Sequence, residues 1–239
     1  MSKKTINQKG NLIEDITNTI KPDFIFNNEP INRFNYSANN INQNLINKNE
    51  VLKKLKNQIN SIENCNLKDN SNNLILGDGN IDSSVMIIGE APGLEEDKYG
   101  KTFQGVIGEL LSKMLIAIEI NRKNIYCTYA VNFRPPEDRK PTNHEIKRYS
   151  AFLKEHISII NPKIVILMGS SAMEAVTGIN GKISSERGKW KEVIIKNITY
   201  PVMITFNPSY LIRFPENKKF SWVDLKKIKQ KIEDLNIKI

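Results

Sequence analysis

The residues best suited to chemistry lie in the segment Val85–Gly108, where a short apolar run leads into a loop rich in carboxylates. The four apolar residues Val85–Ile88 are enough for a buried strand and too few for a helix. Gly89, Pro92 and Gly93 then break regular structure. The loop carries four acids and one aromatic ring, Glu90, Glu95, Glu96, Asp97 and Phe103. Because ligands of open α/β sheets bind outside the carboxyl ends of the strands, this loop is the first candidate for a site.

Two further loops, at 132–142 and 207–215, follow other predicted strands and add polar side chains. They supply three arginines and one amide, Arg134, Arg139, Arg213 and Asn207. Carboxyl ends of parallel strands share one edge of a sheet, so the three loops can form one crevice. Carboxylates, a ring and guanidinium groups together suit a planar base with a sugar-phosphate attached, since the arginine fork matches phosphate.

The elements that must position these loops alternate between strand and helix. Apolar runs predict strands at 85–88, 125–131, 163–168 and 201–206, and helical spacing predicts helices at 50–62, 106–119, 143–160 and 222–234. Thr142 and Glu145 form a capping box at the start of one helix. A further short strand is expected at 74–76 and a hairpin at 183–198. The alternation indicates an α/β fold with a parallel sheet covered on both faces.

Composition limits the class of protein. The chain has 239 residues, with 35 Lys and Arg against 26 Asp and Glu, a formal charge of +9. This excess has two equally weighted explanations, a codon bias toward Lys and Asn, or attraction to a polyanion such as nucleic acid. Cys65 and Cys127 are the only cysteines, which fits a reducing compartment. With no signal peptide and no membrane-length apolar run, we expect a cytoplasmic protein.

Two regions are expected along the chain. Residues 1–48 are rich in Asn and predict a partly disordered extension with a short helix around 12–20. Residues 49–239 predict one folded domain.

Five motifs, in order, resemble the uracil-DNA glycosylases of the iron–sulfur class, usually called family four. They are GEAPGLEEDKYGKTFQGVIGELL (89–111), FRPPEDRKPTNHE (133–145), PKIVILMGSSA (162–172), RGKW (187–190) and NPSYLIRFPENKKFSW (207–222). The N-terminal extension is similar to that of alphaproteobacterial members. The resemblance implies a three-layer sandwich with a central four-stranded parallel sheet flanked by helices. It also implies hydrolysis of the N-glycosidic bond of uracil in DNA, after the base is flipped out of the stack.

The resemblance assigns roles to residues. Glu90 matches the acid that places water, and Asn207 begins the motif that cradles the leaving base. Substrate contacts are expected from Ala91, Pro92, Gly93, Phe103, Tyr129 and Ser209. DNA contacts are expected from Arg134, Arg139, Arg187, Tyr210, Leu211 and Arg213. Several of these residues also have a structural alternative. Glu90 could cap the next helix, and Phe103 could belong to the hydrophobic core. Leu211 and Ile212 could also be core residues instead of a wedge inserted into DNA.

Three departures from the family pattern bear on activity. Asn207 stands where the family has His, so a charge-assisted hydrogen bond to the leaving base becomes a neutral one. Tyr129 stands where the family has the Asn that reads the uracil edge. The four cluster cysteines would fall at Ile62, Cys65, Phe133 and Tyr149, and only Cys65 is a thiol. We therefore expect no iron–sulfur cluster and no metal site.

Two functions from different classes follow. The first is a monomeric DNA glycosylase acting on uracil in single- or double-stranded DNA to start base excision repair, with activity reduced by the replacements. The alternative is a catalytically weak or inactive DNA-binding member of the superfamily. An unrelated hydrolase or nucleotide-binding protein is a weaker third reading, because no phosphate loop or catalytic triad motif supports it.

Overall fold

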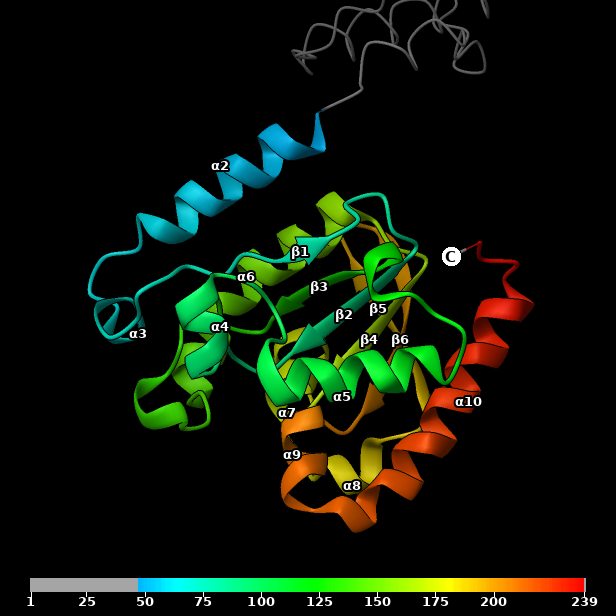
Figure 1. The fold of residues 1–239 in the computed structure, drawn as a ribbon. Coiled ribbons are helices and arrows are strands. Elements are labelled where there is room, and N and C mark those ends of the chain that lie inside the picture. The colour runs from blue at the N-terminus through cyan, green and yellow to red at the C-terminus, as the bar shows by residue number, and fades with distance from the viewer. Residues whose placement is uncertain (1–46, 239) are drawn as a thin grey trace, which may run out of the picture. The chain divides into compact units, whose positions relative to one another are not determined.

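A central sheet organises the protein in the computed structural model, which describes residues 47–238 (Figure 1). Its six strands are β1 (Asp78–Gly79), β2 (Val85–Gly89), β3 (Tyr126–Tyr129), β4 (Ile164–Met168), β5 (Trp190–Ile195) and β6 (Ile198–Thr205). They lie in the order β1-β3-β2-β4-β6-β5. The four inner strands are parallel, as expected, and each edge adds one antiparallel strand.

The helices connect the strands and cover the sheet. They are α2 (Lys48–Asn60), α3 (Asn66–Asp69), α4 (Leu94–Tyr99), α5 (Gly105–Ile116), α6 (Asn143–Ile160), α7 (Ser170–Thr177), α8 (Ile183–Glu186), α9 (Pro208–Arg213) and α10 (Lys218–Asp234). Short 3-10 turns lie at Arg122–Asn124, Pro136–Asp138 and Pro215–Asn217. The predicted capping box forms at α6, where Thr142 and Glu145 cap each other's backbone. No helix within residues 47–238 is long and apolar enough to cross a membrane.

Both faces of the sheet are buried. Val85 and Ile87 of β2 point into one core, with residues from α5 and α10, whereas Met86 and Ile88 point into another, with α6 and α7. All five residues of β2 and of β4 are buried. This is why central strands of this fold read as continuous apolar runs. The three-layer arrangement predicted from the sequence is confirmed.

Three local predictions need correction. Residues 74–76 form no strand, although Ile75 N–H donates to the Asn132 carbonyl, and the short edge strand is β1 instead. The segment 183–198 begins with α8 before β5 pairs with β6. The last helix starts at Lys218 rather than Trp222, directly after a 3-10 turn. Most of the predicted N-terminal extension, residues 1–46, lies outside the described residues.

Candidate active site

A cavity of about 720 Å³ opens at the carboxyl ends of the parallel strands. It is lined by eleven of the fourteen residues proposed from the sequence, Glu90, Ala91, Pro92, Gly93, Phe103, Tyr129, Arg139, Asn207, Ser209, Tyr210 and Arg213. The cavity therefore lies where the rule that ligands bind beyond the carboxyl ends of strands predicts it. Arg134, Arg187 and Leu211 do not line it.

Glu90 directly follows β2 and is held at the start of α7. Its Oε1 accepts hydrogen bonds from the Ser171 backbone N–H at 3.0 Å and the Ser170 hydroxyl at 3.2 Å. Lys140 Nζ lies 3.9 Å from the same oxygen. The positive end of the α7 helix dipole and the Lys140 ammonium therefore both lie beside this carboxylate. Glu90 is thus a positioned, partly exposed acid rather than a cap of the helix that follows it.

Gly169 makes room for this carboxylate. Its backbone is in the left-handed region with φ +104°, and an added Cβ would lie 2.4 Å from Glu90 Cδ. A side chain at position 169 would therefore displace Glu90, as well as strain the turn. Ser170 and Lys140 were not predicted as site residues. The signal for Ser170 was available, because it follows the carboxyl end of β4.

Asn207 connects the motif at 207–222 to Glu90. Its Oδ1 accepts from the Ser209 N–H at 3.1 Å, which caps α9, and its Nδ2 donates to Glu90 Oε2 at 3.3 Å. The cap fixes which end of the amide faces the carboxylate. Asn207 is buried. Because one N–H of its amide already donates to Glu90, the second N–H is the one available to a bound base.

Phe103 and Tyr129 form one wall of the cavity as a pair. The Tyr129 hydroxyl accepts from the Phe103 backbone N–H at 2.8 Å, and the two ring centroids are 5.0 Å apart. Phe103 has a left-handed φ of 50°, which presents that N–H to the phenol. Gly89 is required beneath them, since a Cβ there would lie 2.7 Å from the Tyr129 ring. Burial raises the pKa of Tyr129 well above its ordinary value, so the phenol is neutral.

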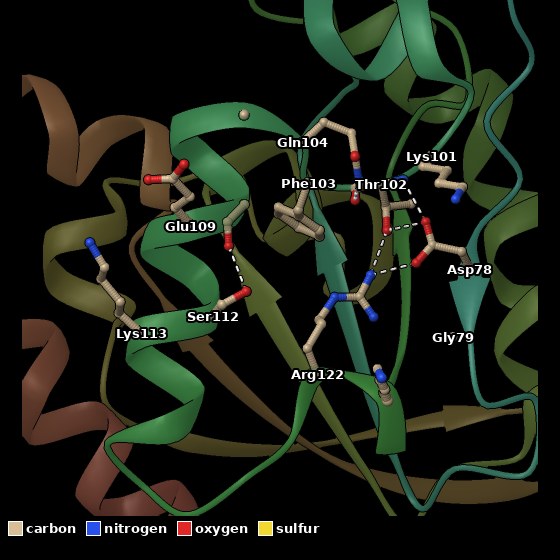
Figure 2. A pocket seen from close by; sticks show the side chains of 13 residues that line it. Asp78, Gly79, Lys101, Thr102, Phe103, Gln104, Glu109, Ser112, Lys113 and Arg122 are labelled. Atoms are coloured by element: carbon tan, nitrogen blue, oxygen red, sulfur yellow. Dashed lines mark hydrogen bonds and ion pairs between the residues drawn. The ribbon is translucent and has the colours of Figure 1, made fainter.

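The loop that carries Phe103 is fixed from behind, as Figure 2 shows. Asp78 accepts from the Thr102 N–H at 2.5 Å and the Thr102 hydroxyl at 2.8 Å, and it pairs with Arg122 at 2.5 Å. Glu96 fixes the pocket side, accepting from Gly93 N–H at 3.0 Å and Gln104 N–H at 2.9 Å. Phe103 is therefore held by polar contacts on both sides of the loop.

The other acids of the loop divide by position. Glu95 lies exposed at the cavity rim. Asp97 is buried away from the cavity and accepts from the Asn72 and Asn73 backbone N–H groups at 2.9 Å. Burial alone would raise the pKa of Asp97, but the hydrogen bonds from Ser71, Asn72 and Asn73 outweigh it and lower the pKa. Asp97 is thus a structural acid that anchors residues 71–73.

Two of the residues predicted to contact DNA pack against the protein itself. Leu211 is 1% exposed and packs in the core with α5, whereas its neighbour Ile212 is 38% exposed. Arg187 donates through Nε to buried Asp224 at 2.9 Å and lies over the Phe206 and Phe220 rings. Leu211 is thus a core residue and Arg187 is the partner of a buried acid, so each has a structural role.

The remaining arginines lie at or near the rim. Arg139 is paired with Glu145 at 2.6 Å and Arg134 with Asp138 at 2.7 Å. Arg213 makes no ion pair with any residue in the range 47–238. A guanidinium at the rim without a carboxylate partner is the one best placed to meet a phosphate.

The positions expected for iron–sulfur ligands lie in a hydrophobic cluster. Cys65, Phe133 and Tyr149 pack with Leu55, Ile59, Leu67 and Val131, and Ile62 packs against them. Cys65 Sγ lies 3.2 Å from the Tyr149 hydroxyl. Such clusters need thiolate ligands, and three of the four positions offer none. Nor do any three His, Cys, Asp or Glu side chains within the described part of the chain converge as a metal site. The residues present do not fit the cluster.

Comparison with known proteins agrees with this geometry. A family model described as the uracil DNA glycosylase superfamily matches residues 76–229. A Type-4 uracil-DNA glycosylase of Thermotoga maritima is 37% identical over 155 residues, covering 64% of this chain and 79% of the relative. The Type-4 enzyme of Sulfurisphaera tokodaii is 33% identical, covering 76% and 84%, and that of Pyrobaculum aerophilum is 31% identical, covering 69% and 86%. The chain belongs to the uracil DNA glycosylase superfamily.

Proposed function

We propose that the protein is a uracil-DNA glycosylase, which hydrolyses the bond between uracil and deoxyribose in DNA. The observation that carries the proposal is the arrangement of Glu90 and Asn207 across one cavity, joined by a hydrogen bond of 3.3 Å. The cavity of about 720 Å³ has room for a flipped nucleotide, and the Phe103 ring lines its wall. The Type-4 relatives support uracil as the base removed.

The chemistry needs charge stabilisation on both sides of the bond. As the N1–C1′ bond breaks, positive charge grows on the sugar and negative charge on uracil. The Glu90 carboxylate stabilises the sugar cation and orients a water molecule, whose oxygen bonds to C1′ while its proton passes to the carboxylate or solvent. Uracil leaves with the bonding electrons and gains a proton at the end of the reaction.

The base side is served by a neutral donor. The second N–H of Asn207 can donate to the leaving uracil, because the first is held by Glu90. Lys140 and Arg213 line the same cavity and add positive charge at its rim. We propose that these groups act together where relatives of the resembled class use His.

The proposal includes activity without an iron–sulfur cluster, a monomeric state and a cytoplasmic location. The apolar packing of Phe133, Tyr149 and Cys65 supports the first point, because it fills the cluster positions with side chains that do not ligate iron. The other two stay predictions.

The experiment is release of free base from oligonucleotides that contain one uracil, hypoxanthine or mismatched thymine, in single and double strands. We expect free uracil, with or without a strong iron chelator. The protein would instead be a non-catalytic DNA-binding protein if it bound these oligonucleotides but released no base, even at stoichiometric enzyme.

A further inference from the structure

A column of aromatic rings runs from the cavity to the protein surface. Phe206 and Tyr210 both line the cavity, and their ring centroids are 5.0 Å apart with an interplanar angle of 27°. Phe214 continues the column, 4.8 Å from Tyr210 and tilted by 38°. Phe206 is buried, Tyr210 is half-buried, and Phe214 is 45% exposed. The column therefore ends in a ring that is open to a partner.

The backbone that carries the outer ring is fixed by hydrogen bonds to its neighbours. The Phe214 N–H donates to the Tyr210 carbonyl at 2.9 Å, and the Phe214 carbonyl accepts from the Asn217 N–H at 3.1 Å. Asn217 Nδ2 also donates to the Tyr210 hydroxyl at 3.3 Å. At the inner end, the Arg187 guanidinium lies 5.6 Å from the Phe206 ring centroid and is anchored on Asp224. Because the backbone at Phe214 is already fixed, binding of a planar ligand to its ring does not need to order this segment.

Three cations and one acid, Glu216, lie near Phe214 in the sequence. Arg213 precedes it, and Lys218 and Lys219 follow within the next turn, all three exposed. Exposed aromatic rings beside positive charge are the combination with which proteins bind single-stranded nucleic acid, because any base offers a π-face and every nucleotide a phosphate.

From this geometry we propose that Phe214 is a stacking platform for the nucleobase next to the flipped uracil, so that the site favours single-stranded DNA. The proposal rests on the proposed function. In a duplex the neighbouring base is already stacked and paired, and it gains little from the ring. In a single strand that base is free to stack on Phe214 while Arg213 meets the phosphate between the two nucleotides. Phe214, Tyr210 and Phe206 then extend the base stack into the cavity.

The test measures binding of the full chain to oligonucleotides with 2′-fluoro-deoxyuridine, which resists hydrolysis. One neighbouring base, on the 5′ or the 3′ side, is replaced by an abasic analogue. We expect the wild type to bind the intact single strand about tenfold more tightly than one of the two abasic strands. Phe214→Ala should lose about the same factor on the intact strand and become indifferent to the abasic position.

Three comparisons decide the outcome. Phe214→Tyr should retain the preference and Phe214→Leu should lose it, because only the former keeps a π-face. Trp222→Ala, an equally exposed aromatic change on α10 outside the column, should change nothing. The proposal would be overturned if Phe214→Ala lost equal affinity for single-stranded and double-stranded DNA. It would also be overturned if Phe214→Leu retained the preference for the intact strand. Either result would indicate a simple apolar wedge. Because binding is measured without turnover, the result is independent of whether wild type releases uracil.

Discussion

The amide of Asn207 donates to the carboxylate of Glu90 at 3.3 Å, while its oxygen caps α9. This hydrogen bond joins the motif at 89–111, which follows β2, to the motif at 207–222, which follows β6. In the proposed reaction Asn207 has two roles, which are to orient the acid and to present its second N–H to the leaving base. This relationship makes the replacement of the family's His testable.

Replacing Asn207 with His should increase the rate of uracil release. An imidazolium gives the leaving anion a charge-assisted hydrogen bond, which is worth about 1–2 kcal/mol more than a neutral one, or about tenfold to thirtyfold in rate. The gain should grow as the pH falls toward the ordinary His pKa of about 6.5. Single-turnover rates between pH 6 and 8 measure it. A slower enzyme at every pH would mean that the cap on α9 matters more than the donor.

Replacing Tyr129 with Phe should destabilise the Phe103 wall. The change removes the acceptor of the buried Phe103 N–H, and an unsatisfied buried donor costs about 1–3 kcal/mol. We expect the free energy of unfolding to fall by that amount in urea denaturation and the KM for uracil DNA to rise. Tyr99→Phe removes a hydroxyl from an exposed ring and is the matched control. Equal stability of the two variants would contradict the role given to Tyr129.

Acid should destabilise the protein through one histidine. Burial lowers the pKa of His156 to about 3, while it is about 6.5 in the unfolded chain. The unfolded state thus binds the proton first, and stability falls as the pH drops from about 6.5 toward 3. The loss is about 2 kcal/mol at pH 5, from 1.36 kcal/mol per pH unit. His156→Gln should remove this loss, measured as unfolding free energy against pH, and His144→Gln, at the other and exposed histidine, should retain it.

Replacing Arg187 should change the stability of the protein, whereas replacing Arg213 should change its DNA binding. Asp224 is fully buried, so Arg187→Ala leaves a buried carboxylate without its cation, at a cost of about 3–5 kcal/mol. Arg213→Ala should leave stability unchanged but weaken DNA binding and lower its salt dependence by about one counterion. Thermal unfolding and DNA titrations at several salt concentrations separate the two. A stable Arg187→Ala variant with weak DNA binding would restore Arg187 as a DNA contact.

Much of the fold was predictable from the sequence because its inner strands are buried on both faces. The runs at 85–88 and 164–168 are apolar throughout, with turn signals after them, and the strand-end rule then located the cavity. Glu90 and Asn207 were singled out because both lie in loops after predicted strands, and the resemblance then suggested their roles.

The roles of Leu211, Arg187 and Tyr129 needed coordinates. Consecutive residues of a short helix point in different directions, so the pattern could not tell buried Leu211 from exposed Ile212. Arg187 is paired with an acid on α10, a contact between distant segments that no local pattern contains. The hydrogen bond of Tyr129 depends on the left-handed backbone of Phe103, which directs the Phe103 N–H to the Tyr129 hydroxyl.

The most direct test of the account compares uracil release by wild type and Glu90→Gln under single-turnover conditions. Glutamine retains an oxygen to accept from Ser171 and Ser170 but removes the charge. We predict release by wild type and a rate about 10²–10⁴-fold lower for the variant, with unchanged unfolding free energy. Glu95→Gln, at the exposed rim, should match wild type. Equal rates for Glu90→Gln and wild type would contradict the proposal that Glu90 is the catalytic carboxylate of this site.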